Sequence, residues 1–90
     1  MTSDLKTFYR SALPARIAAL RAACDAFGAG DAAAEATVRQ IAHSLRGSGG
    51  TYGFPHISAA AAAVEQAMSG ALQQRVDELI EILRAEASSS

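Results

Sequence analysis

Apolar residues recur at intervals of three and four along nearly the whole chain, which is the spacing of one face of an α-helix. A first short helix is predicted around Leu5 and Phe8, and Pro14 then either kinks it or begins a second helix. The second helix ends at the glycines at positions 28 and 30. Its apolar stripe consists of Leu13, Ile17, Leu20, Cys24 and Phe27.

Three further helices are predicted between short breaks. Asp31 is a good N-cap for the third, Gly53-Phe54-Pro55 predicts a turn in which proline opens the fourth, and Ser69-Gly70 predicts the stop before the fifth. Their stripes are Val38, Ile41, Ala42 and Leu45; then Ile57, Ala61, Val64 and Met68; then Leu72, Val76, Leu79, Ile80 and Leu83.

Short connections between amphipathic helices favour antiparallel neighbours. We therefore expect an all-α fold, an up-and-down antiparallel four-helix bundle with an additional short N-terminal helix. A single domain is expected over residues 1–87, with a frayed C-terminal tail over residues 88–90. The composition agrees, because 22 of the 90 residues are alanine, the best helix former.

The charge balance argues against a nucleic-acid ligand. Eight basic and nine acidic residues give a net charge of −1, which leaves no positive excess to neutralise a phosphate backbone.

Cys24 is the single cysteine, which excludes an internal disulfide and fits a reducing compartment. There is no apolar run of about 20 residues and no signal-peptide core. We expect a soluble, cytoplasmic monomer that binds no membrane.

His43 is predicted to face outward on the third helix. With Val38 at zero on a helical wheel of about 100° per residue, Leu45 falls within about 20° and marks the buried face, whereas His43 falls about 140° away. Gly47, at about 180°, and Gly50, at about 120°, share the outward face. Because glycine destabilises a helix interior by about 1 kcal/mol relative to alanine, this bare backbone favours close approach of another macromolecule over an ordinary surface histidine.

Glu65 is the predicted partner of this histidine. If the third and fourth helices form a hairpin that turns at Phe54, His43 and Glu65 lie at the same level, since each is eleven residues from the turn. A carboxylate there would accept the Nδ1 proton and leave Nε2 with an outward lone pair, which makes a nucleophile. Without that pairing, Glu65 would be a solvated partner of some surface cation.

Other motifs are excluded by their spacing. The segment from Gly47 to Tyr52 is not G-x-G-x-x-G, because Tyr52 stands at the last glycine position and no strand precedes it. No G-x-x-x-x-G-K-[ST] phosphate loop is present, and the order around Ser48 fails the G-x-S-x-G elbow of hydrolases. His43 and His56 are thirteen residues apart without further ligands at metal spacing, so no metal site is expected.

The segment from His43 to Gly53, HSLRGSGGTYG, closely resembles the signature of histidine phosphotransfer (HPt) domains. That signature is a histidine, any residue, leucine, lysine or arginine, glycine, serine or alanine, and a further glycine ten residues after the histidine. Leu13–Leu20 resembles the family's entry into its second helix, and Val64-Glu65 resembles the Leu-Glu pair that ends its helical hairpin. Nearly the whole chain is covered by the resemblance.

The resemblance implies a helical bundle whose exposed histidine accepts a phosphoryl group on Nε2 and exchanges it with an aspartate of a response-regulator receiver domain. By position, His43 would be phosphorylated, Arg46 would be the cation near the phosphate, Gly47 would permit close approach, and Glu65 would orient the imidazole. Arginine at this position and glycines at 49 and 50 depart mildly from the family's usual residues.

The surface that a receiver approaches is expected to include Gly47 and Gly50, with Arg39 at its flank. A histidine kinase or hybrid kinase is the other partner that the resemblance implies. No cofactor is expected, because the chain has no cluster of carboxylates for Mg²⁺, and the Mg²⁺ that phosphoryl transfer needs is expected on the receiver.

The leading hypothesis is an HPt module of a multistep two-component phosphorelay. It would be a phosphoryl carrier with no nucleotide site or kinase activity of its own. The alternative is a noncatalytic helical adaptor or phosphate sink that binds a receiver or kinase. His43, with glycines on its face and Glu65 at its level, favours the first.

Overall fold

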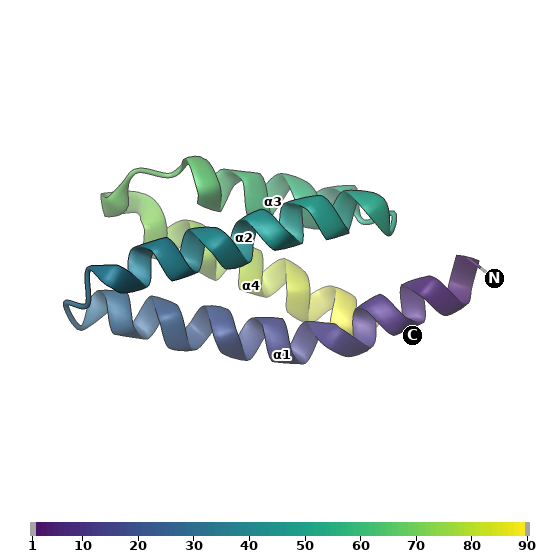
Figure 1. Ribbon diagram of the computed structural model, residues 1–90. Helices are drawn as coiled ribbons and strands as arrows, with labels where there is room; N and C mark the ends of the chain where they lie inside the picture. Colours follow the sequence, from purple (N-terminus) through teal and green to yellow (C-terminus); the bar gives the residue numbers. More distant parts are fainter. Residues whose placement is uncertain (1, 90) are drawn as a thin grey trace.

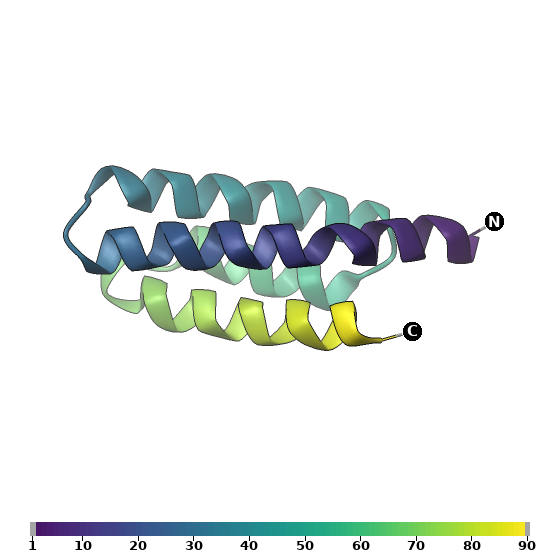
Figure 2. The same cartoon turned by 90° about the horizontal axis from the view of Figure 1, so that it is seen from below.

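The computed structural model describes residues 2–89, with the side chains of residues 4–89, and every regular element in that range is helical. The elements are α1 (Thr2–Gly28), α2 (Ala33–Thr51), α3 (Pro55–Gln66), a short 3₁₀ turn η1 (Ser69–Ala71) and α4 (Leu72–Ser88). Each helix packs against the next, and α4 packs back against α1. Figures 1 and 2 show consecutive helices running in opposite directions, which confirms the antiparallel four-helix bundle.

The expectation of a separate N-terminal helix is wrong. A single helix, α1, spans 27 residues and continues through Pro14. Tyr9 and Leu13, before the proline, and Leu20, after it, are all buried in one core, so packing on both sides holds the helix together despite the hydrogen bond that proline removes. The first turns of α1 extend past the end of the bundle, as Figure 2 shows.

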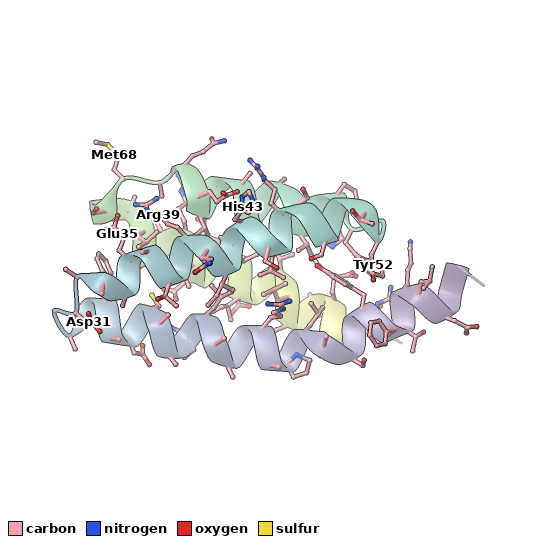
Figure 3. The ribbon with its side chains drawn as sticks, viewed as in Figure 1. Asp31, Glu35, Arg39, His43, Tyr52 and Met68 are labelled. Carbon is pink, nitrogen blue, oxygen red and sulfur yellow. The ribbon has the colours of Figure 1, made fainter. Side chains whose placement is uncertain are left out.

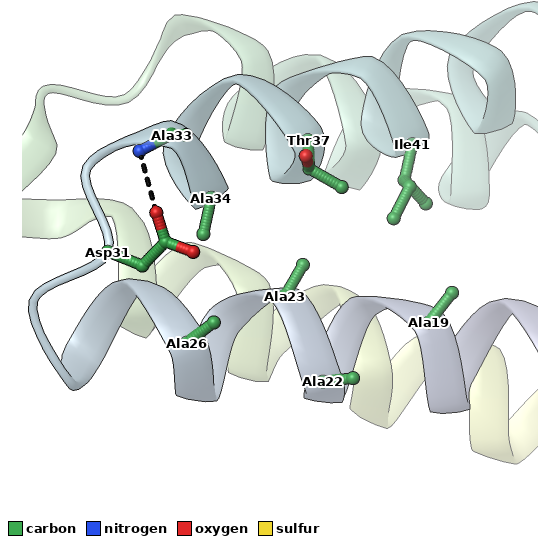
Figure 4. A pocket seen from close by; sticks show the side chains of 9 residues that line it. All are labelled: Ala19, Ala22, Ala23, Ala26, Asp31, Ala33, Ala34, Thr37 and Ile41. Atoms are coloured by element: carbon green, nitrogen blue, oxygen red, sulfur yellow. Dashed lines mark hydrogen bonds between the residues drawn. The ribbon is translucent and has the colours of Figure 1, made fainter.

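The helix α2 begins and continues largely as predicted. The N-cap residue is Ala32, one position after the predicted Asp31, and the Asp31 carboxylate accepts a hydrogen bond from the backbone N–H of Ala33, the first residue of the helix, at 3.0 Å. Figure 4 shows this bond beside a shallow hollow between α1 and α2. The hollow is lined mainly by alanines, together with Asp31, Thr37 and Ile41. At its other end, α2 continues through the glycines at positions 47, 49 and 50, and it ends only at Thr51.

The turn between α2 and α3 lies where the sequence predicts it. Gly53 has a φ of 88°, a left-handed conformation that favours glycine, and the N–H of Phe54 donates to the carbonyl of Gly49 at 2.7 Å. Pro55 is the first residue of α3, the helix position that tolerates its missing N–H. Phe54 is buried at the turn and stacks on Tyr9 of α1, which closes this end of the bundle.

The end of α3 differs from the prediction. Met68 does not continue the buried stripe, because the helix ends at Gln66, Ala67 and Met68 are extended, and the Met68 residue is 82% exposed. The predicted stop at Ser69-Gly70 is the 3₁₀ turn η1. At the C-terminus, α4 includes Ser88, the first residue of the predicted tail; Ser89 is extended, and Ser90 lies outside the described residues.

The core combines the predicted stripes of all four helices. Ile17, Phe27 and Ile41 are only partly buried, at the edges of those stripes. The fully enclosed large side chains are Leu13, Leu20, Val38, Leu45, Ile57, Val64, Leu72, Val76, Leu79, Ile80 and Leu83. Between residues 2 and 89, no helix has the length and the hydrophobicity needed to cross a membrane.

Candidate functional site

His43 lies on the outer face of α2, as the helical wheel predicts. Its side chain is 67% exposed, while Ala42 and Leu45 on either side point into the core. Figure 3 shows the ring on the side of α2 that faces α3. The imidazole Nδ1 lies 2.8 Å from Oε2 of Glu65, so the contact predicted from the hairpin count is confirmed.

This contact indicates which nitrogen of the His43 ring carries the proton. A carboxylate can only accept a hydrogen bond, so a hydrogen bond of this length requires that Nδ1 carries the proton. In the neutral imidazole the other nitrogen, Nε2, then holds an unprotonated lone pair. Because the His43 side chain is two-thirds exposed, that lone pair is open to an incoming electrophile.

Glu65 stands in the last turn of α3, with its side chain only 20% exposed. Its second oxygen, Oε1, lies 3.1 Å from Nε of Arg46, which makes an ion pair but lacks hydrogen-bond geometry. The carboxylate therefore lies between an imidazole and a guanidinium, both on α2. Arg46 is 45% exposed, so the predicted cation stands beside the histidine and is still accessible from solvent.

The glycines of α2 fall into two groups. Gly47, one turn from His43, is exposed, and a β-carbon added there would have nothing within 4 Å. Gly50 is also exposed, although its β-carbon would touch the Ser58 hydroxyl at 3.8 Å. Gly49 is buried instead, and its β-carbon would lie 3.1 Å from the backbone nitrogen of Ser58. The helical wheel could have found this packing position, since Gly49 falls about 20° from Val38 on the buried face.

The structure places Arg39 differently from its predicted role at the receiver surface. The Arg39 side chain is 27% exposed, and its guanidinium is bonded within the chain, to Glu35 one turn earlier and to the backbone carbonyls of Val64 and Glu65. A contact between Arg39 and a receiver stays a prediction. Its backbone contacts at the end of α3 were missed, because they depend on where that helix stops.

Two ionisable groups, the Glu35 carboxyl and the Cys24 thiol, have pKa values shifted from their ordinary ones. Hydrogen bonds from Arg39 and Ser69 lower the pKa of Glu35, which keeps this carboxylate ionised. Burial raises the pKa of the Cys24 thiol, which leaves it an uncharged core residue and a poor nucleophile. The second histidine, His56, lies in the first turn of α3, and its Nε2 is 3.4 Å from a carboxylate oxygen of Glu86 in α4. Among the described side chains, no group of three potential metal ligands is gathered.

Comparison of the sequence with protein families agrees with this geometry. Residues 4–88 match the family described as the Hpt domain, which is nearly the whole chain. Comparisons with curated proteins and with solved structures found no match. The matched range contains His43, Arg46, Gly47 and Glu65. The chain therefore belongs to the Hpt domain family, whose members perform histidine phosphotransfer in two-component signalling.

Proposed function

We propose that this chain carries a phosphoryl group on Nε2 of His43 and exchanges it with the aspartate of a receiver domain within a multistep phosphorelay. The observation that supports the proposal most strongly is the exposed imidazole with its Nδ1 bound to the Glu65 carboxylate. This arrangement directs a nucleophilic nitrogen outward on a face that Gly47 leaves bare.

In the transfer step, the Nε2 lone pair attacks the phosphorus of the receiver's aspartyl phosphate. An N–P bond forms while the P–O bond to the aspartyl carboxylate breaks, and the electron pair leaves with that carboxylate. The proton on Nδ1 stays in place. As the N–P bond forms the ring gains positive charge, which the Glu65 carboxylate 2.8 Å away stabilises. Return of the phosphoryl group to an aspartate reverses the same changes.

The chain contributes positioning and charge. Arg46 can turn from the Glu65 carboxylate toward the phosphoryl oxygens, because nearly half of its side chain is exposed. Phosphoryl transfer depends mainly on in-line geometry and charge neutralisation. In the proposed reaction the receiver supplies the Mg²⁺, and this chain supplies the nucleophile and one cation.

A receiver domain phosphorylated with labelled phosphate, mixed with this protein and Mg²⁺, tests the proposal. We expect acid-labile, base-stable label on the wild type and on His56→Gln, and none on His43→Gln. His56 is the matched control, because it is the only other histidine and its side chain is half exposed.

The same experiment separates the carrier from the alternative, a helical adaptor or phosphate sink. A carrier passes its label on to a second, unphosphorylated receiver, whereas a sink accepts the label and keeps it. A folded wild-type protein that binds receivers but takes label from none of them would be an adaptor.

A further inference from the structure

Arg39 joins α2 to the end of α3 through a network of short hydrogen bonds. Its Nη1 donates to the backbone carbonyls of Glu65 at 2.9 Å and Val64 at 3.3 Å. Its Nε and Nη2 both donate to one oxygen of Glu35, at 3.1 and 2.8 Å. The other oxygen of Glu35 accepts a hydrogen bond from the Ser69 hydroxyl in η1 at 3.0 Å.

The carbonyls that Arg39 binds belong to the terminus of a helix. The last carbonyls of an α-helix lack helical N–H partners, here because the chain becomes extended at Ala67. The Val64 carbonyl still accepts the N–H of Ala67 at 3.3 Å, so the shorter bond to the Glu65 carbonyl, at 2.9 Å, is the main contribution of Arg39. A cation at the C-terminal end of a helix also lies at the negative end of its dipole. Arg39 thus caps α3 from the neighbouring helix.

The capped turn is the one that carries the partner of the histidine. Arg39 binds the backbone carbonyl of Glu65, and the Glu65 carboxylate lies 2.8 Å from Nδ1 of His43. Glu35, Arg39 and His43 are spaced four residues apart, and Figure 3 shows them following one another along α2. All three guanidinium nitrogens of Arg39 are engaged inside the chain, which favours an internal role over a partner contact.

We propose that Arg39 is a positioning residue, which sets the imidazole of His43 for transfer by fixing the backbone of Glu65. Glu35 holds the guanidinium in place, and Ser69 ties this arrangement to η1. The kinetic part of this inference rests on the proposed function. Its spectroscopic part concerns only the protonation state of the ring nitrogens and does not depend on phosphoryl transfer.

The test compares Arg39→Gln and Arg39→Lys with the wild type. The matched control is Arg75→Gln, which removes an exposed arginine of α4 that pairs with Glu78 in the same helix. Long-range ¹H–¹⁵N NMR at about pH 9, where imidazoles are neutral, measures the fraction of His43 protonated on Nδ1. Rapid mixing with a phosphorylated receiver then gives the transfer rate at saturation and the receiver concentration at half-saturation.

Arg39→Gln is expected to lower the Nδ1-protonated fraction and to slow transfer at saturation by about threefold to tenfold, the size of one lost hydrogen bond. The half-saturating concentration should stay within about twofold of the wild type. Arg39→Lys should recover part of both losses, because it keeps the charge but not the planar fork. Arg75→Gln should match the wild type throughout.

Three outcomes would overturn the inference. A raised half-saturating concentration with unchanged ring protonation would make Arg39 a receiver contact instead. Unchanged transfer rate and ring protonation would show that Arg39 has no influence on His43.

If Arg39→Gln does not fold, Glu35→Gln takes its place, since it loosens the guanidinium without removing it. Wild-type ring protonation in that variant would refute the inference. Absence of transfer in the wild type would refute the proposed function, while the NMR comparison would still decide the role of Arg39.

Discussion

Gly47 and Gly49 stand two positions apart in α2 and face different surroundings. A β-carbon at Gly47 would have nothing within 4 Å, one turn from the exposed His43. A β-carbon at Gly49 would press on Ile57 and on the backbone of Ser58 in α3. The missing side chain leaves room for a partner at the first position and for a neighbouring helix at the second.

This difference separates the outer face of α2 from its contact with α3, although both belong to one short motif. The contact with α3 also includes the Ser58 hydroxyl, which donates to the carbonyl of Arg46 at 2.8 Å. The contact between α2 and α3 sets the level at which Glu65 lies beside His43. Changes on the outer face should therefore slow transfer without lowering the stability of the fold, and changes at the α3 contact should lower stability first.

The largest effect is expected for Gly47→Leu. The added side chain projects into the space where a receiver must come within bonding distance of His43, and transfer should slow by about a hundredfold or more. The free energy of unfolding should rise by as much as about 1 kcal/mol, because leucine is a better helix former than glycine. Urea denaturation and single-turnover transfer on the same variant measure both quantities. Transfer at the wild-type rate would remove the close-approach argument.

The same substitution at Gly49 should have the opposite pattern. Gly49→Leu overpacks the contact with Ile57 and Ser58, and the free energy of unfolding should fall by about 1–3 kcal/mol despite the gain in helix propensity. Urea denaturation followed by circular dichroism gives the value. If Gly49→Leu were as stable as Gly47→Leu, the two glycines would not differ and the comparison would fail.

Substitutions of Glu65 test how much this residue of α3 contributes to the reactivity of His43 on the outer face of α2. Glu65→Ala removes the acceptor for the Nδ1 proton, and transfer should slow by about tenfold. Glu65→Gln keeps a carbonyl oxygen that accepts the same bond, so it should lie between alanine and the wild type. The helical circular dichroism signal should be unchanged in both. Equal rates in all three proteins would make Glu65 an ordinary surface carboxylate.

The smallest effect is expected for Arg46→Ala. Loss of this partly exposed cation should slow transfer or shorten the lifetime of the phosphohistidine by about threefold to fivefold, the effect of one charge-assisted hydrogen bond in a solvated site. Labelling should still reach completion. Complete loss of labelling in a folded Arg46→Ala protein would contradict this prediction, because it would make the arginine essential for accepting the phosphoryl group.

The outward His43 and its pairing with Glu65 could be predicted because both follow from periodicity and from one recognisable turn. Helical angles fix which side a residue faces, and Phe54 fixes the level of residues on the two sides of the hairpin. The same arithmetic places Gly49 on the buried face. What it cannot give is the 3.1 Å approach to Ser58, which depends on how closely two helices pack.

The continuous α1 and the role of Arg39 could not be predicted in this way. Proline favours a helix break locally, and only burial of Tyr9 and Leu13 before it keeps α1 whole. Met68 extends the apolar pattern of α3, yet that helix ends at Gln66. That earlier end exposes the carbonyls that Arg39 binds, and no local pattern in α2 reports it.

The central claim is that Glu65 keeps the proton on Nδ1 of His43 and thereby makes Nε2 the nucleophile. Phosphorus–nitrogen and proton–nitrogen NMR couplings of the ¹⁵N-labelled, receiver-phosphorylated protein test it most directly, because they identify the nitrogen that carries each substituent. The account predicts phosphorus on Nε2 and a proton on Nδ1 of His43. Phosphorus on Nδ1, or on any residue other than His43, would contradict it.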